Sequence, residues 1–278
     1  MLTYNPSVKG RYFYKQGTYM SFETILINLD HGVATLVIKN HPLNVLSTQV
    51  GHEINKALDK IETDPAISVI VITGDGNKAF AAGADIRELQ KLSGVEAEAM
   101  ANIWDCLFTR IEEFRLPVIA AVNGMAFGGG CELAMACDIR YASENALFGQ
   151  PEINLGIIPG WGGTQRLPRL VGKGRALELM MTGDTFDVKE AKQMGLINQI
   201  VSPQELMATV RNLARRLCNK GGLALTAIKT CVNQGLNQKM EEGLALESRE
   251  FGVISSTEDK IEGIAAFLEK RPANFRKN

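Results

Sequence analysis

Short apolar runs alternate with apolar residues at helical spacing over the first part of the chain. The runs at 34–38, 69–73 and 117–122 are almost entirely apolar and predict buried strands. Helical stripes lie between them, formed by Val50, Ile54, Ala57, Leu58 and Ile61 over 48–62 and by Ile103, Leu107, Ile111 and Phe114 further on. A helix over 128–137 and strands over 139–142 and 146–148 follow. This alternation predicts the α/β class, with strands covered on both faces.

From about residue 185 the pattern changes to helices alone. Asp187 and Glu190 have the spacing of a capping box, as do Ser202 and Glu205, with Pro203 at the first helical position. Further signals continue to the end of the chain: Leu206, Val210, Leu213 and Leu217 at helical spacing, then Thr257 as the cap of a helix bearing Ile261, Ile264 and Leu268. We expect no strand here, and hence a C-terminal all-helical region whose apolar stripes need a surface to pack against.

Composition excludes several classes of function. The 278 residues carry a net charge of −1, which gives no whole-molecule field to attract nucleic acid or an anionic membrane. No apolar run approaches the roughly 20 residues that span a bilayer. Five cysteines, scattered and never spaced as metal ligands, indicate reduced thiols and a cytoplasmic protein. We therefore predict no metal, no nucleic acid and no membrane partner.

The three histidines exclude two further kinds of enzyme. His31, His41 and His52 all lie in the first fifth of the chain and lack the spacing of zinc ligands. No nucleophile elbow is present for a histidine to meet, which argues against a serine hydrolase.

The first 19 residues differ from the rest. They carry Lys9, Arg11 and Lys15 with four tyrosines, no acidic residue and no apolar segment of the kind found in secretory signals. We expect an N-terminal extension over 1–19, whose composition allows disorder. A core over 20–200 and a helical region over 201–278 complete the expected domain organisation.

The main candidate for chemistry is a glycine run beside two acids. Gly128–Gly130 lead into Glu132 on a predicted helix, and Glu152 follows in a loop shaped by glycine and proline. Glycines allow a ligand to approach the backbone N–H groups of a helix start, and two carboxyls in different surroundings can divide acid and base roles. Three structural alternatives stay open: close strand–helix packing for the glycines, an ion pair of Glu132 with Arg140 or Arg166, and a solvated loop acid at 152.

A second candidate backbone segment lies at 80–87. Its small residues can bring N–H groups close to a ligand, with Arg87 available for a phosphate, although a tight packing turn is the structural alternative. The preceding stretch, Gly74–Ala79, matches the G-x-G-x-x-A fingerprint of dinucleotide-binding proteins. The fingerprint should open into a helix, and Gly83 interrupts any helix there, so we do not expect a dehydrogenase.

Several motifs in order along the chain resemble the crotonase superfamily, and within it the enoyl-CoA hydratases. The resemblance runs from about Phe22 to the C-terminus and rests on six stretches: 40–46 (NHPLNVL), 81–86 (AAGADI), 123–133 (NGMAFGGGCEL), 148–152 (FGQPE), 158–167 (IPGWGGTQRL) and 269–275 (EKRPANF). It implies a spiral of repeated ββα units, with C-terminal helices that build trimers and pair them into a homohexamer. No cofactor is implied, because coenzyme A is part of the acyl-CoA substrate.

The same resemblance implies roles for residues. The N–H groups of Ala84 and Gly129 would form an oxyanion hole for the thioester carbonyl. Glu132 would activate a water molecule, and Glu152 would deliver a proton to the alpha carbon of a 2-enoyl-CoA. The implied contacts with substrate and coenzyme A are Ala82, Gly83, Ala84, Asp85, Ile86, Arg87, Gly129 and Gly160, with Phe251 and Lys270 acting across a subunit boundary.

Other functions in the superfamily remain alternatives. Isomerases of the family usually need only the acid that matches Glu152, so the presence of both acids favours a hydratase over an isomerase or an inactive homologue. Trp161 stands where such enzymes often have a small residue, which leaves the acyl group open, including branched and cyclic ones. One branch binds RNA through a lysine-rich helix, but here Lys56 and Lys60 are offset by neighbouring acids.

Overall fold

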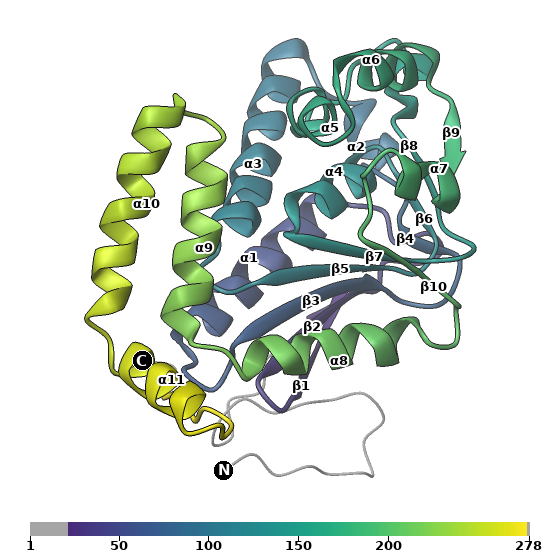
Figure 1. The fold of residues 1–278 in the computed structure, drawn as a ribbon. Coiled ribbons are helices and arrows are strands. Elements are labelled where there is room, and N and C mark those ends of the chain that lie inside the picture. The colour runs from purple at the N-terminus through teal and green to yellow at the C-terminus, as the bar shows by residue number, and fades with distance from the viewer. Residues whose placement is uncertain (1–21, 277–278) are drawn as a thin grey trace, which may run out of the picture.

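The computed structural model describes residues 22–276, which form two sheets with helices around them (Figure 1). The larger sheet has the order β1-β2-β3-β5-β7-β10. Its strands are β1 (Ile25–Asp30), β2 (Val33–Ile38), β3 (Val69–Gly74), β5 (Val118–Val122), β7 (Ile139–Ser143) and β10 (Gln199–Val201). Only β1 and β2 pair antiparallel, and the other neighbours are parallel. The α/β class is confirmed.

The smaller sheet runs beside the larger one in the order β4-β6-β8-β9. It contains β4 (Ala79–Ala81), β6 (Met125–Phe127), β8 (Leu147–Gly149) and β9 (Thr185–Asp187). Each of the pairs β3–β4, β5–β6 and β7–β8 places its first strand in the larger sheet and its second in the smaller one. The first two pairs are then followed by helices, so the ββα unit repeats along the chain as expected.

The central strands bury both faces, which explains their continuous apolar sequence. In β3, Ile70 and Ile72 belong to the main core, whereas Val69 and Val71 face the other way into a second cluster. Helix α8 (Leu206–Cys218) covers that second face with Leu206, Val210 and Ala214. Alternate side chains of a strand point to opposite faces, so a strand with a helix on both sides is apolar at nearly every position.

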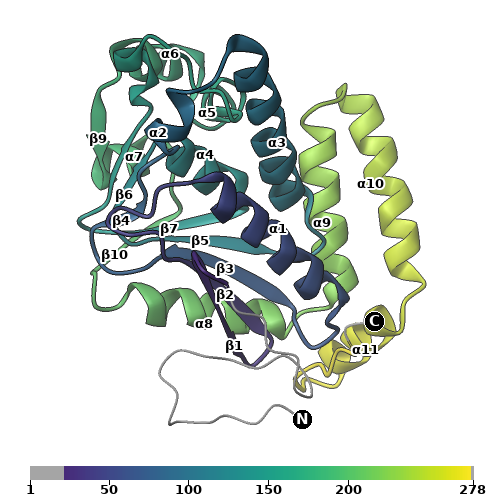
Figure 2. The same ribbon diagram turned by 180° about the vertical axis from the view of Figure 1, so that it is seen from behind.

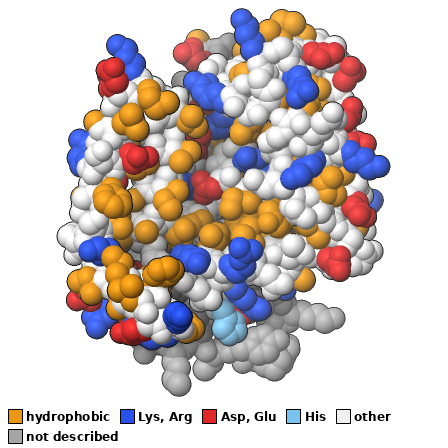
Figure 3. All heavy atoms as spheres, viewed as in Figure 1, with side chains coloured by type: hydrophobic (Ala, Val, Ile, Leu, Met, Phe, Trp, Pro, Cys, Tyr) orange, Lys and Arg blue, Asp and Glu red, His pale blue; other side chains and the backbone are white. Residues whose placement is uncertain are grey.

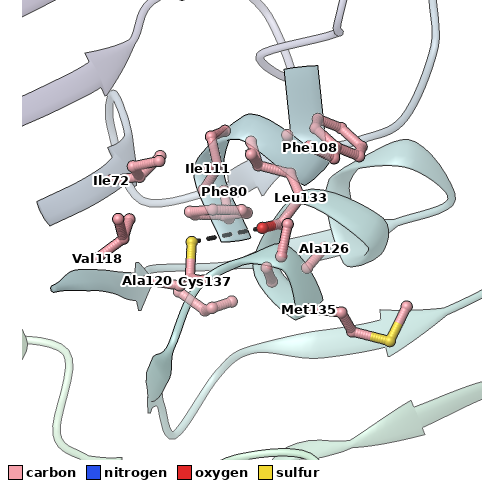
Figure 4. Close-up of a cluster of buried hydrophobic side chains, with 14 of the residues drawn as sticks. Ile72, Phe80, Phe108, Ile111, Val118, Ala120, Ala126, Leu133, Met135 and Cys137 are labelled. Atoms are coloured by element: carbon pink, nitrogen blue, oxygen red, sulfur yellow. Dashed lines mark hydrogen bonds between the residues drawn. The ribbon is translucent and has the colours of Figure 1, made fainter. Parts of the chain in front are cut away.

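The main core lies between the two sheets and three helices. These are α1 (Thr48–Thr63), α3 (Gly94–Glu113) and α4 (Gly129–Ala136), and every residue of α4 is buried. Figure 4 shows Leu133 of α4 among side chains that include Phe80 of β4 and Phe108 of α3. Helix α4 is therefore held on all sides, which fixes the position of its N-terminus.

The remaining helices surround this core. They are α2 (Ile86–Leu89), the short 3₁₀ helix η1 (Pro151–Leu155), α5 (Gly163–Val171), α6 (Lys173–Thr182), α7 (Val188–Gln193), α9 (Gly222–Gly235), α10 (Met240–Ser255) and α11 (Glu258–Leu268). Helix α9 packs beside α3, where Lys229 Nζ donates to Ile111 O at 3.3 Å, and the same Nζ lies 2.9 Å from Asp138 Oδ2 just before β7. Figures 1 and 2 both show α9 between the core and α10. Apolar side chains gather on the outer faces of α9, α10 and α11 (Figure 3).

The expectation of no strand after about residue 185 is wrong. Strand β9 pairs antiparallel with β8, and β10 pairs parallel with β7. Each is only three residues long, too short for an alternating pattern to identify a strand, and tertiary pairing decides the outcome. The helical region itself begins directly after β10, close to the expected boundary at 201, and the capping box of Asp187 and Glu190 is confirmed.

Two finer expectations also need correction. Ile103 does not belong to the buried face of α3, since it is 55% exposed, whereas the other expected residues, Leu107, Ile111 and Phe114, are buried together with Trp104 and Phe108. The second capping box does not form: Ser202 Oγ donates to the Glu205 side chain in a turn, and α8 begins after it at Leu206. Thr257 does cap α11, accepting from the N–H of Lys260.

No helix within residues 22–276 is both long and apolar enough to cross a membrane. The extension expected over 1–19 lies outside the described residues.

Candidate active site

Three consecutive glycines at the start of α4 each touch a different element. Gly128 has a positive φ of 51°, and a Cβ there would lie 2.5 Å from Glu152 Oε1. A Cβ on Gly129 would overlap the ring of Trp161, and one on Gly130 would overlap the last carbonyl of β4. Close packing is therefore a real reason for all three glycines. Two of the three contacts are to residues of the candidate site, so the same glycines also shape that site.

Two unused backbone N–H groups lie near each other at this helix start. Gly129 is the first residue of α4, where an N–H has no partner inside the helix. Its N atom lies 3.7 Å from the position of a Cβ on Gly83, the residue before Ala84. Next to Ala84, Leu46 N donates to Gly83 O and Asp85 N donates to Leu46 O. Among the backbone hydrogen bonds of residues 22–276, none is donated by the amide of Ala84 or Gly129.

Glu132 is buried in the first turn of α4, with 1% of its surface exposed. Its Oε1 accepts hydrogen bonds from Trp161 N at 2.9 Å and from Gly163 N at 2.7 Å. Burial, and then the charge of Glu152, raise the pKa of Glu132 to about 8, against the action of these two donors. A carboxyl in this position can exchange a proton near neutral pH.

The alternative of an ion pair at Glu132 is wrong. Arg140 donates to the carbonyl oxygens of Leu196 and Cys137. Arg166 pairs with Glu112 through contacts of 2.8 and 2.9 Å. Neither guanidinium reaches Glu132, so the carboxyl is held by backbone N–H groups rather than by a cation.

Glu152 is the second residue of η1, directly after β8. Its Oε2 is buried and has no hydrogen-bond partner among the described residues. Burial raises the pKa of Glu152 to about 7. Glu152 is therefore not the solvated loop acid of the structural alternative. An unpartnered buried carboxyl oxygen favours the protonated form and leaves that oxygen available to a ligand.

Both carboxyls and both N–H groups face one cavity of about 370 Å³. The expected site residues among its lining are Ala82, Gly83, Ala84, Ile86, Gly129, Glu132, Glu152 and Gly160. The structure thus brings together the catalytic candidates, the two amide donors and four of the other expected contacts.

Four expected contacts do not line this cavity. Asp85 caps α2 by accepting from Arg87 N at 2.9 Å, and Arg87 lies on that short helix. Phe251 lies on α10 and is 75% exposed, and Lys270 follows α11. Since α10 and α11 lie beyond α9 (Figures 1 and 2), Phe251 and Lys270 do not meet the site of their own chain.

Helix α3 supplies a wall of the cavity that the sequence did not reveal. Met100 and Ala101 line it, and Trp104 behind them stacks on Trp161 with ring centroids 4.4 Å apart and an interplanar angle of 14°. Phe108 meets the edge of the Trp161 ring. Of these residues, the sequence indicated only Trp161, because it stands within a recognisable motif at a position where such enzymes often have a small residue.

The dinucleotide-like segment at Gly74–Ala79 has a different role. Gly74 ends β3 and Ala79 begins β4, so a strand rather than a helix follows the glycines. A Cβ on Gly74 would overlap the carbonyl oxygen of Ala79. The glycine therefore allows a tight strand-to-strand connection, as the sequence context indicated.

The fold and the site define a class of protein: an α/β protein built from repeated ββα units, in which two carboxyls and the start of α4 line one cavity. The profile of the enoyl-CoA hydratase/isomerase family matches residues 28–278. The chain belongs to this family.

Individual relatives cover nearly the whole chain. It is 46% identical over 258 residues to a crotonyl-CoA hydratase from Syntrophomonas wolfei, covering 92% of this chain and 99% of that one. It is 42% identical over 261 residues to a short-chain-enoyl-CoA hydratase from Clostridium acetobutylicum, covering 93% and 100%. The crystal structure of an enoyl-CoA hydratase from Bacillus anthracis superposes with a TM-score of 0.89 at 34% identity, covering 92% and 100%. The resemblance to crotonases and the fold that it implied are confirmed.

Proposed function

We propose that this protein is an enoyl-CoA hydratase, which adds water reversibly to the double bond of a 2-enoyl-CoA and gives a 3-hydroxyacyl-CoA. One observation carries the proposal: the buried carboxyl of Glu132, the carboxyl of Glu152 with its buried Oε2, and two unused backbone N–H groups share a cavity. The hydratase names of the relatives from Syntrophomonas wolfei and Clostridium acetobutylicum support it.

The N–H groups of Ala84 and Gly129 act as the oxyanion hole. Their hydrogen bonds draw electrons toward the thioester oxygen, which makes the beta carbon electrophilic and stabilises the enolate formed after water attacks. Gly129 adds the positive end of the α4 dipole. Losing one such donor typically slows a reaction by about a hundredfold or more.

The two carboxyls divide the proton transfers. Glu132 accepts two backbone hydrogen bonds, which favour its carboxylate, so it takes a proton from the attacking water. Glu152 has an unpartnered buried oxygen, which favours the acid, so it gives a proton to the alpha carbon. Burial raises the pKa of Glu132 to about 8 and that of Glu152 to about 7, so the interacting pair holds one proton near neutral pH, and the form with that proton on Glu152 is the one that reacts.

Coenzyme A is bound as part of the substrate, and no other cofactor takes part. The segment from Ala82 to Arg87 runs past the thioester position, with Arg87 near the phosphates. Phe251 and Lys270 contact coenzyme A from a neighbouring subunit in a hexamer of two trimers. The exposed apolar faces of α9, α10 and α11 support such an assembly, because faces of this extent are rarely left in water.

The acyl group is short. Beyond the beta carbon, the chain meets the ring of Trp161, which is 5% exposed and backed by Trp104 and Phe108. Trp104 in turn lies against α1, because a Cβ on Gly51 would come within 3.2 Å of its ring. A stack supported in this way cannot move aside to admit a long chain.

The direct test is hydration of crotonyl-CoA by the purified protein, followed as loss of enoyl-thioester absorbance. We expect turnover, and we expect Glu132→Gln and Glu152→Gln each to slow it by at least about a hundredfold, since each removes a proton transfer. A folded protein that turns over no enoyl-CoA would overturn the proposal. Full hydration activity in Glu132→Gln would contradict the role of Glu132 as the base, and a wild type that shifts the double bond of an enoyl-CoA without adding water would instead be an isomerase.

A further inference from the structure

The turn at Trp161–Gly163 holds the base of the reaction. Its two N–H groups, from Trp161 and Gly163, are the hydrogen-bond donors that the structure gives to Glu132 Oε1. The position of the carboxylate and the ease with which it carries a charge therefore depend on how rigidly this turn is held.

Arg166 holds the turn from the side away from Glu132. Its Nη1 donates to Trp161 O at 3.3 Å. Its Nε and Nη2 both donate to Glu112 Oε2, at 2.9 and 2.8 Å, and Nη2 also lies 3.3 Å from Thr109 Oγ1. The Arg166 side chain is only 12% exposed. It therefore joins the turn to α3, the helix that carries Glu112 and Thr109.

Gly162 shows how closely the guanidinium lies against the turn. Its φ is 94°, and a Cβ there would overlap Nη1 of Arg166. The amides of Gln165 and Arg166 donate to Gly162 O, at 3.0 and 2.8 Å, which ties the turn to the start of α5. The guanidinium, the turn and the helix start form one unit directly behind the carboxylate.

We propose that Arg166, anchored by Glu112, is a positioning residue for the hydration reaction: it fixes the turn whose N–H groups orient Glu132 toward water. The inference rests on the proposed function and extends it to a residue that lies outside the cavity. Arg166 touches neither substrate nor Glu132, so it acts only through the turn and through its charge.

The charges around Glu132 set the direction of the effect. Glu152 on η1 and Asp105 on α3 both raise the pKa of Glu132, and Cys131 adjoins it on α4. The positive charge of Arg166 offsets the negative charge of Asp105. Burial raises the pKa of Asp105, and the guanidinium of Arg166 acts to lower it. Replacing Arg166 with a neutral residue loosens the two donors and leaves Asp105 unopposed. Both changes raise the pKa of Glu132.

The test is the pH profile of kcat/KM for crotonyl-CoA. For a pair that works with one proton, the optimum lies midway between the two apparent pKa values. A rise of about one pH unit in the pKa of Glu132 therefore moves the optimum up by about half a unit in Arg166→Gln. Arg166→Lys keeps the positive charge, so its pH optimum should lie between that of Arg166→Gln and that of the wild type. Arg169→Gln, on the same helix and hydrogen-bonded within residues 22–276 only to Gln165, is the matched control and keeps the wild-type optimum.

Glu112→Gln distinguishes two effects on the pKa of Glu132: the anchoring of Arg166, which fixes the turn, and the negative charge of Glu112 itself. It also tests the proposal if Arg166→Gln does not fold. Removing a negative charge alone would lower the pKa of Glu132 and move the optimum down. Loss of the Arg166 anchor moves the optimum up, and that is the result we expect. An unchanged or lowered optimum in Glu112→Gln, in an enzyme that still turns over crotonyl-CoA, overturns the inference. Absence of turnover in the wild type overturns the proposed function instead.

Discussion

Glu53 and Glu132 are both buried glutamates on helices, yet their surroundings give them opposite properties. Glu53 accepts hydrogen bonds from Glu23 N, Thr24 N, Thr24 Oγ1 and Gln49 Nε2. Burial acts to raise its pKa, but these donors outweigh it and the pKa is lowered. Glu132 has two donors and a second carboxyl nearby, and its pKa is raised. A saturated carboxylate stabilises the fold, whereas an unsaturated one is available for chemistry.

This contrast predicts opposite effects on stability. The folded-state pKa of Glu132 is raised to about 8, well above the ordinary value of a glutamate, so the free energy of unfolding falls as pH rises through that window. Glu132→Gln removes this loss. The free energy of unfolding of the variant, relative to that of the wild type, should therefore increase by up to about 1.4 kcal/mol per pH unit between about pH 5 and pH 7. Thermal unfolding scans across this range measure it.

Glu53→Gln is the matched comparison. Because the folded-state pKa of Glu53 is lowered, its carboxylate stabilises the fold at pH values above its unfolded-state pKa. This stabilisation is lost as pH falls. The variant should therefore be less stable than wild type at neutral pH, with the difference shrinking in acid. If Glu132→Gln were also destabilised at neutral pH, the carboxyl would be structural rather than reserved for catalysis.

At the residue scale, the sequence predicted both acids and the glycines because residue type and order along the chain were enough. It could not predict what binds Glu132. The donors Trp161 and Gly163 lie 29 and 31 residues further along, and only the folded chain brings their N–H groups to the carboxylate.

At the scale of elements, the stack of Trp104 on Trp161 joins α3 to the turn before α5, and the proposed function makes this stack the limit of the acyl chain. Trp161→Ala should therefore extend the range of substrates. The ratio of kcat/KM for crotonyl-CoA to that for decenoyl-CoA should fall by roughly tenfold or more, the worth of about two newly buried methylene groups. Spectrophotometric assays over a series of chain lengths measure this ratio.

Ile153→Ala, on η1 outside the cavity lining, is the control and should keep the wild-type ratio. A wild-type enzyme that already accepts decenoyl-CoA as well as crotonyl-CoA would show that the stack does not limit the chain.

Prediction of elements succeeded where the apolar pattern was long. The runs that became β2, β3 and β5 are covered on both faces, so their whole sequence reports burial. It failed for β9 and β10, because three residues cannot display a period and pairing partners define those strands. In α3, the expected stripe was right at Leu107, Ile111 and Phe114 but wrong at Ile103, where the neighbouring Trp104 is the buried residue.

At the scale of the whole molecule, the C-terminal helices leave large apolar side chains in solvent. On α11 these include Ile264, Phe267 and Leu268. The expected trimers, paired into a hexamer, would cover them. Replacing both Phe267 and Leu268 with glutamate should produce smaller particles in analytical ultracentrifugation, since burying an unpaired charge opposes assembly.

Met181→Glu is the control for assembly, because Met181 is also an exposed apolar residue but lies on α6, away from α11 (Figure 1). Wild-type sedimentation is expected for that variant. A wild-type protein that sedimented as a monomer would contradict the assembly, and with it the contacts expected for Phe251 and Lys270.

The central claim is that Glu132 and Glu152 add one water molecule across the double bond of a short 2-enoyl-CoA. Its most direct test is mass spectrometry of the product formed from crotonyl-CoA in heavy-oxygen water. We predict a 3-hydroxyacyl-CoA that carries one heavy oxygen, formed by the wild type and almost absent with Glu132→Gln. An unlabelled enoyl-CoA with a shifted double bond, or labelled product at the wild-type rate from Glu132→Gln, would contradict the account.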